Sequence, residues 1–126
     1  MTDQTSIYPS LTVVRLHDEA AMVPERRRNV VINRVNESCL RLAVFEGEYP
    51  WHSHPDSDEL FLVLEGRLEI ELTDRPGVVL GPGDAFTVPA GVIHRTRARQ
   101  RSVNLCFEHL TAETRFVDAD SPISIT

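Results

Sequence analysis

The strongest constraint on the fold is a series of short segments in which apolar and polar residues alternate, separated by turns rich in glycine and proline. In RLEIEL (67–72), Leu68, Ile70 and Leu72 share one face of an extended chain, which is the pattern of a half-buried strand. Helical spacing is nearly absent, although HDEAAMV (17–23) fits one helical turn. Many short strands at regular spacing predict an all-β fold, a sandwich or a barrel. Further strand candidates are CLRLAVFE (39–46), ELFLVLE (59–65), AFTVP (85–89), IHRTRA (93–98) and SVNLCFEHL (102–110).

Length and charge restrict the class of protein. A chain of 126 residues suffices for one domain with one hydrophobic core. The net charge of −6 argues against nucleic acid as the main partner, because binding to phosphates needs a basic surface. No apolar run approaches the roughly 20 residues of a membrane span, and the first residues lack the pattern of a secretion signal. We therefore expect a single cytoplasmic domain over 1–126, without a membrane or nucleic-acid partner.

The stretch WHSHPDSDEL (51–60) places titratable side chains directly before the most apolar strand. His52 and His54 are two residues apart, so on an extended chain both rings lie on one face, with Cα atoms about 6.5 Å apart. Two imidazoles at this separation can bind one cation. Glu59 shares a strand face with Phe61, and a buried carboxylate there is costly unless a cation neutralises it. The alternative is that both histidines lie on a polar loop and bind nothing.

A third histidine makes the binding hypothesis stronger. The stretch GPGDAFTVPAGVIHRTRA (81–98) contains a turn, a strand, a second turn and then His94. Thr96 and Ala98 share the strand face of His94, whereas the arginines between them point the other way. The chain thus has two hairpin-like units, each beginning a strand with a ligand-type residue that faces inward.

These two stretches resemble the paired motifs of the cupin superfamily over about residues 40–108. The matching positions, in chain order, are Gly47, His52, His54, Glu59, Gly66, Gly83, Pro89, Gly91 and His94. The resemblance implies a small antiparallel β-barrel of the double-stranded β-helix or jelly-roll type. It also implies strands over 11–35 before the barrel core and a short tail after it. One divalent metal ion would be held by His52, His54, Glu59 and His94.

The chain departs from the cupin motifs at two places. Only four residues separate Gly47 from His52, where the motif has five. The asparagine of the second motif is Ala98 here, so a polar amide is missing from the expected cavity wall. We therefore expect a mainly apolar wall, with few polar groups beyond the metal ligands. The motif glycines have mechanical roles: Gly66 permits a tight turn, and Gly83 and Gly91 are expected at positive φ.

Three imidazoles and one carboxylate suit Fe, Mn, Ni, Cu or Zn as a divalent ion, and the sequence does not choose among them. The leading hypothesis is a small metal-dependent enzyme, an isomerase, lyase or dioxygenase, that acts on a small polar molecule. The alternative is a metal-holding module that binds or senses a small ligand without catalysis. A cupin-type fold alone does not decide between them, because one fold hosts many reactions.

Further residues are candidates for the wall of the cavity, with plain core packing as the alternative for the aromatic ones. In the strand 102–110 the pattern leaves open whether the face of Cys106 and Glu108 or the opposite face is interior. A catalytic role for Cys106 as nucleophile is a third, weaker hypothesis, and Cys39 is expected to be buried and inert. The candidates for the wall are Phe45, Trp51, Phe61, Phe86, Thr96, Ala98, Cys106 and Glu108.

Two surface features leave alternatives open. ELFLVL (59–64) is apolar on both faces, so its outer face packs within the chain or against a second subunit, and we expect a homodimer. The arginine runs at 26–28 and 95–101 are expected to be solvated, or alternatively to hold an anionic substrate at the barrel mouth.

Overall fold

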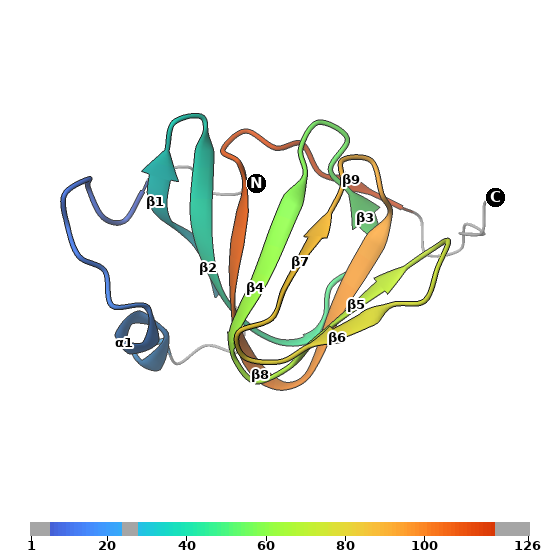
Figure 1. Ribbon diagram of the computed structural model, residues 1–126, viewed down its shortest axis with the longest axis horizontal. Coiled ribbons are helices and arrows are strands. Elements are labelled where there is room, and N and C mark those ends of the chain that lie inside the picture. Colours follow the sequence, from blue (N-terminus) through green and yellow to red (C-terminus); the bar gives the residue numbers. More distant parts are fainter. Residues whose placement is uncertain (1–5, 24–27, 118–126) are drawn as a thin grey trace.

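The computed structural model describes residues 6–23 and 28–117 and is mainly an antiparallel sheet (Figure 1). In these ranges one helix, α1 (Leu16–Ala21), precedes nine strands, which confirms the predicted all-β class. The strands are β1 (Arg28–Val35), β2 (Ser38–Glu48), β3 (His52–Ser53), β4 (Glu59–Glu65), β5 (Leu68–Leu72), β6 (Val78–Leu80), β7 (Ala85–Val88), β8 (His94–His109) and β9 (Arg115–Phe116).

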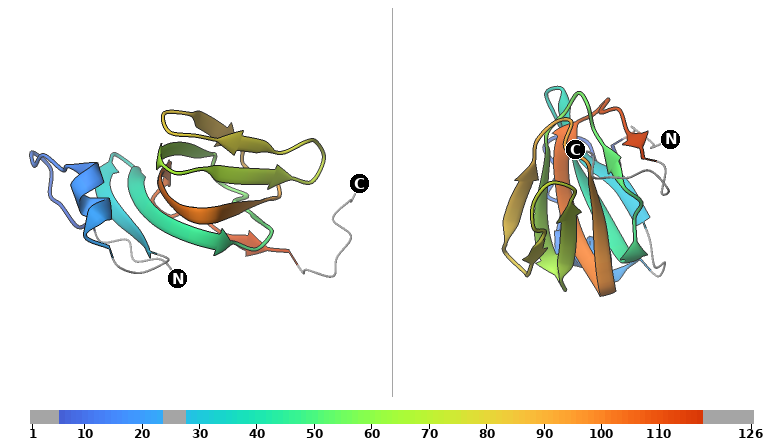
Figure 2. Two further views of the ribbon diagram at one scale, coloured as in Figure 1. Left: turned by 90° about the horizontal axis from the view of Figure 1, so that it is seen from below. Right: turned by 90° about the vertical axis from the view of Figure 1, so that its right-hand side faces the viewer.

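Strand β8 organises the sheet, because it pairs with four other strands along its 16 residues. Its first half pairs with β3 and β5, and its second half pairs with β4. Strand β2 runs beside most of its length, from Ser38 opposite His109 to Glu48 opposite Arg97. Figure 2 shows β2 and β8 curving along the molecule, with α1 at one end and the β5–β6 hairpin towards the other.

The sheet is strongly folded but does not close. Within the described residues, β1, β6, β7 and β9 each pair with a single strand, so each of them is an edge. The expectation of a closed barrel is therefore not met. Strands β3 and β9 have only two residues each, so they supply too few backbone hydrogen bonds to continue the sheet further.

Apolar residues gather on both faces of the sheet. On the inner face, Phe61 and Val63 of β4 are buried in a cluster with Leu68 and Ile70 of β5. On the outer face, a second cluster packs beneath α1. Its buried members are Ala20, Ile32, Leu42, Val44, Val103 and Leu105.

The outer cluster explains why ELFLVL is apolar on both faces. Leu62 and Leu64 of this stretch pack against the outer cluster, so part of its outer face is covered within the chain. The segment 11–35 is expected to form strands, but its described residues, 11–23 and 28–35, contain α1 followed by the single strand β1. The alternating pattern extends only over β1, whereas the first part holds the single helical turn that the spacing of residues 17–23 allows.

Other predicted features also lie where the pattern places them. Gly83 and Gly91 have positive φ, at 89° and 84°. Cys39 and Cys106 are both buried and unpaired. The arginines of β8 pair with surface glutamates, for example Arg97 with Glu48 at 3.0 Å. Arg26, Arg27 and the expected tail at 118–126 lie outside the described residues. No helix in the described ranges has the length and apolarity to cross a membrane.

Gly66, in the turn between β4 and β5, is predicted to be less tolerant of alanine than Gly83. Both residues have positive φ, but a Cβ at Gly66 would lie 2.7 Å from the carbonyl oxygen of Arg101, whereas nothing lies within 4 Å at Gly83. The left-handed backbone alone costs a side chain roughly 1–2 kcal/mol. We expect Gly66→Ala to lower the free energy of unfolding by clearly more than Gly83→Ala in urea denaturation. Equal losses would show that the close approach to Arg101 carries no cost.

Candidate metal centre

The pairing of β3 with β8 brings together residues that are far apart in the sequence. His52 of β3 lies directly opposite His94, the first residue of β8. Their ring centroids are 4.3 Å apart, and the ring of His54 lies 5.0 Å from that of His52. Glu59 enters the group from the start of β4. One ligand atom from each of these four buried residues lies within 4.8 Å of the others.

Backbone carbonyls fix the orientation of each ring. Nδ1 of His52 lies 2.8 Å from the carbonyl oxygen of Pro50, and Nδ1 of His94 lies 3.0 Å from that of Val92. Nδ1 of His54 lies 3.0 Å from the carbonyl oxygen of Glu113. Since a carbonyl only accepts, each Nδ1 donates its proton, and in a neutral ring Nε2 then carries the lone pair. The three rings therefore present the nitrogen that can bind a metal.

The centre of the group contains polar atoms without hydrogen-bond partners. Oε1 of Glu59 lies 3.1 Å from Nε2 of His54 and 3.5 Å from Nε2 of His94. Neither Oε1 of Glu59 nor Nε2 of His94 makes a hydrogen bond. Buried polar atoms are nearly always satisfied in folded proteins. A cation bound between these atoms would satisfy both, so the residues fit a divalent metal ion.

Without a metal ion, the protons in the group are distributed unevenly. Burial lowers the pKa of His52 to about 4, and the neighbouring His94 adds to this effect. Burial also acts to lower the pKa of His54, but pairing with Glu59 outweighs it and raises the pKa to about 9. Burial acts to raise the pKa of Glu59, but His54 and His94 lower it to about 2. In the metal-free protein a proton on His54 thus neutralises the buried carboxylate.

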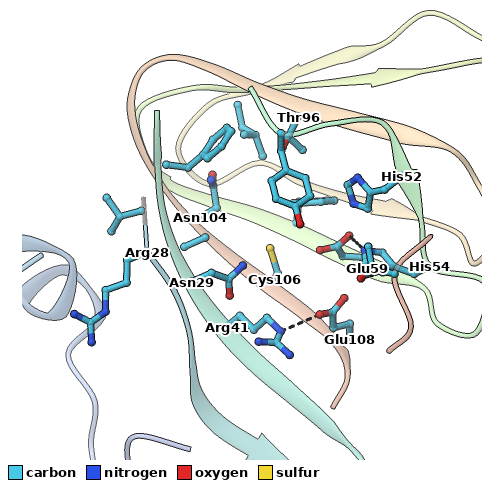
Figure 3. Close-up of a pocket in the computed structure, with 17 residues that line it drawn as sticks. Arg28, Asn29, Arg41, His52, His54, Glu59, Thr96, Asn104, Cys106 and Glu108 are labelled. Atoms are coloured by element: carbon cyan, nitrogen blue, oxygen red, sulfur yellow. Dashed lines mark hydrogen bonds and ion pairs between the residues drawn. The ribbon is translucent and has the colours of Figure 1, made fainter. Parts of the chain in front are cut away.

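A cavity of about 290 Å³ extends from this group over the inner face of the paired strands β2 and β8 (Figure 3). Five of the residues expected on its wall line it, together with His52, His54 and Glu59; they are Phe45, Phe61, Thr96, Cys106 and Glu108. The face of β8 that carries Cys106 and Glu108 is therefore interior. Burial raises the pKa of the Cys106 thiol well above its ordinary value, and the charge of Glu59 adds to this, which disfavours a nucleophilic thiolate.

The other three expected wall residues lie elsewhere. The ring of Trp51 packs under the guanidinium of Arg95, whose Cζ lies 4.9 Å from the ring centroid, on the side of β8 away from the cavity. Phe86 lies opposite Phe61 and packs against the inner cluster. Ala98 is buried within that cluster, and its methyl group does not line the cavity.

The cavity wall is more polar than the sequence indicated. Asn104, on β8, supplies an amide, although the motif position at Ala98 does not. Arg41 stands beside Glu108, and its Nε donates to Oε2 of Glu108 at 2.9 Å. The expectation of few polar groups beyond the metal ligands is therefore not met, although most of the wall surface is apolar. The polar residues on the wall that the sequence analysis did not propose are Asn29, Arg41, Tyr49, Asn104 and Thr114. Arg28, the last residue of the basic run 26–28, also lines the cavity.

A sequence signal for the polar wall was available in β2. Cys39, Arg41 and Ala43 share the face that turns to the cavity, whereas Leu40 and Leu42 pack on the outer side. An arginine on the alternating face between two small residues is unusual for a strand in the middle of a sheet, because an arginine is rarely buried without a partner. The partner, Glu108, lies 67 residues away in the sequence.

A comparison with known families places this geometry in context. The family model described as "Cupin domain" matches residues 38–107. The chain belongs to the cupin family. The match spans β2 to β8, and the four residues of the candidate metal centre all lie within it.

Relatives of this cupin include proteins with and without a described activity. The uncharacterised protein YdbB of Bacillus subtilis is 53% identical over 96 residues, which cover 76% of this chain and 85% of YdbB. A cupin-2 domain containing protein from Shewanella frigidimarina has a similar structure, with a TM-score of 0.73, 31% identity, and coverage of 77% of this chain and 94% of that chain.

One relative has a named activity. The dimethylsulfoniopropionate lyase DddQ of Ruegeria pomeroyi is 40% identical to this cupin over 53 residues, which cover 42% of this chain but 26% of the lyase. Its solved structure has a TM-score of 0.66 and 22% identity, and covers 77% of this chain and 54% of the lyase chain. This structural likeness shows a shared fold.

Glu59→Gln is predicted to lower the pKa of His54 in the metal-free protein from about 9 towards the ordinary value of 6.5. Because the folded pKa of His54 is raised, its pairing with Glu59 stabilises the fold fully below about pH 6.5, and the contribution is lost as the pH rises through about 9. The stability difference between wild type and variant should therefore shrink between pH 7 and 9.5. Chemical denaturation with a chelator present measures it, and a constant difference would contradict the pairing.

Proposed function

We propose that this cupin is an enzyme that holds one divalent metal ion through His52, His54, Glu59 and His94 and acts on a small polar molecule in the adjoining cavity. The observation that carries the proposal is that one ligand atom from each of four buried residues lies within 4.8 Å of the others, and that Nε2 of His94 has no hydrogen-bond partner in the described part of the chain. A polar cluster that served only the fold would be expected to satisfy these atoms within the chain.

The shape of the site supports small-molecule chemistry. Three of the four ligand residues, His52, His54 and Glu59, line a cavity of about 290 Å³, near the lower limit of ordinary ligand pockets, and the fully buried His94 lies beside them. Four protein ligands leave room on a six-coordinate ion for a substrate group or water. When bound, the metal would supply Lewis acidity or, for a redox-active ion, a site for oxygen chemistry.

The residues of the chain have separable tasks. The Pro50, Val92 and Glu113 carbonyls hold the imidazole rings in the orientation that ligation needs, which is the usual role of groups around a metal site. Glu59 supplies the negative charge that compensates part of the charge of a divalent ion. Glu108 stands on the cavity wall with Oε1 unpartnered, within reach of a substrate for transfer of one proton, a step worth roughly 10²- to 10⁴-fold in rate.

Two reaction classes fit the site: elimination or isomerisation by a Lewis-acidic metal, and oxidation by a redox-active metal. The likeness to a dimethylsulfoniopropionate lyase supports the former, and it suggests that lyase's substrate as one member of a test panel. The alternative to catalysis is a module that binds a small ligand on the metal without converting it.

His52→Ala and His94→Ala are each predicted to lower metal affinity by about 100-fold or more. Loss of a group that only orients a ligand costs about 10- to 100-fold, and loss of the ligand itself should cost no less. The matched control is His17→Ala, which removes an exposed histidine paired with Glu65 on the surface. Elemental analysis after purification without added metal should show the loss in the first two variants only. Full metal occupancy in all three variants would show that His52 and His94 are not metal ligands.

Turnover is predicted to require the metal and to identify the reaction class. Protein reconstituted with Fe(II), Mn(II), Ni(II) or Zn(II) is incubated with small hydroxy acids, keto acids and dimethylsulfoniopropionate, with and without air, and the products are followed by NMR. Oxygen uptake restricted to redox-active ions indicates a dioxygenase, and equal turnover with Zn(II) indicates a lyase or isomerase. Tight binding without conversion under every metal would favour the binding module.

A homodimer remains a prediction, as do the single domain and the cytoplasmic location. Phe107 of β8 is exposed on the outer face, with Leu40 of β2 and Leu60 of β4 opposite it on either side. This apolar row offers surface for a second subunit. Phe107→Asp should shift a dimeric mass to that of a monomer in light scattering, whereas Val79→Asp on the edge strand β6 should not. A monomeric wild type in the micromolar range would refute the dimer.

A further inference from the structure

We propose that the cavity selects small carboxylates, with Arg41 as the residue that anchors the carboxylate opposite the metal centre. The inference deepens the proposed function and rests on it in one respect, since the other end of the ligand is taken to bind the metal. It names a substrate class that the metal ligands alone do not specify.

The first observation is the geometry of Arg41. Its side chain is buried, and its single close ion pair is from Nε to Oε2 of Glu108 at 2.9 Å. Within residues 6–23 and 28–117, Nη1 of Arg41 has no hydrogen-bond partner, and neither has Oε1 of Glu108. In Figure 3 the carboxylate of Glu108 lies between the Arg41 guanidinium and the His54–Glu59 pair. The pair therefore leaves a strong donor group of Arg41 buried without a partner in these ranges, on a residue that lines the cavity.

A purely structural pair is expected to look different. Arginine and carboxylate match each other as a fork, with two parallel hydrogen bonds, and a buried pair is stable only when its remaining polar atoms are satisfied. Here one bond is formed and one donor stays unpaired in a buried position, which costs free energy in the absence of a ligand. A carboxylate oxygen of a ligand would satisfy Nη1, while Glu108 holds the guanidinium in place.

The balance of charge points to the same class. When a divalent ion is bound, its two positive charges meet one negative charge from Glu59, and Arg41 is balanced by Glu108. The cavity then carries about one net positive charge. In a site shielded from water an uncompensated charge is costly. A ligand with one or two negative charges offsets this cost, and a neutral ligand does not.

The position of Arg41 distinguishes it from the other arginines. Arg95 and Arg97 on β8 point to the outer face and are balanced by Glu48 and Glu71. Arg41, in contrast, lines the same cavity as His52, His54 and Glu59. A molecule that bridges the two ends needs one group for the metal and a carboxylate for Arg41.

The test uses zinc-loaded protein, because zinc permits binding without oxidation. Isothermal titration calorimetry compares malonate, succinate, glutarate and adipate with the monocarboxylates of the same chain lengths. We expect at least one dicarboxylate to bind about tenfold or more tightly than its monocarboxylate, because a charge-assisted hydrogen bond in a buried site supports such a difference. Equal affinities throughout the series would overturn the inference.

The decisive variant is Arg41→Gln combined with Glu108→Gln. The double change removes both charges but lets the two amides bond to each other, so that no buried charge is left unpaired. It should abolish the preference for the dicarboxylate without changing zinc content. The matched control is Arg97→Gln with Glu71→Gln, an ion pair on the outer face, which should keep the preference. An unchanged preference in the Arg41 variant would refute the anchor.

Two further readouts keep the outcomes separate. If the double variant does not fold, the Nε–H resonance of Arg41 is followed by NMR in the wild type during titration with the dicarboxylate that binds most tightly. A resonance that does not shift overturns the inference. If the wild type binds no zinc, the proposed function fails instead. The role of Arg41 is then tested in the metal-free protein by comparing its affinities for butyrate and butyramide. A preference for butyrate that the double variant loses supports the role, and equal affinities refute it.

Discussion

The burial of Glu59 among three imidazole rings is the interaction on which the site depends. A carboxylate that lies 3.1 Å from one ring nitrogen and 3.5 Å from another cannot remain charged in the interior without a positive partner. In the metal-free protein the partner is a proton, held on His54 at neutral pH because its pKa is raised to about 9. A divalent ion would take the place of that proton and, unlike it, would contact all four residues at once. The four residues are thus compatible with a divalent cation.

Strand β8 gives this site its second half. His94 at its start belongs to the metal centre, and Asn104, Cys106 and Glu108 further along it line the cavity. Because alternate residues of a strand face the same side, one continuous strand presents both the metal ligand and the polar wall. Strand β2, paired with β8 along most of its length, adds Arg41 at the level of Cys106. The spacing between the metal centre and the wall is therefore fixed by regular backbone hydrogen bonds rather than by loops.

The fold class could be predicted from the alternation in the strands, and the grouping of the four metal-centre residues from their match to the two cupin motifs. The polar wall could be predicted only in part, because Arg41 stands out on its face of β2 but its partner does not. Arg41 and Glu108 become partners only through the register of β2 on β8, and a register between distant strands leaves no local trace. Ala98 replaces the asparagine of the second cupin motif, so the sequence indicated that the cavity wall lacks an amide. Asn104, six residues further along the same strand, supplies an amide to the cavity instead.

His54 links the candidate metal centre to the segment between β8 and β9. Its Nδ1 bonds to the carbonyl of Glu113 and lies 3.3 Å from the hydroxyl of Thr114, next to β9, which itself pairs only with β3 in the described residues. Any cation that fixes the ring of His54 thereby also fixes the strand that follows Thr114. Occupancy of the centre and the order of this terminal strand are thermodynamically linked, so slower amide exchange in β9 would report cation binding at a distance from the ion itself.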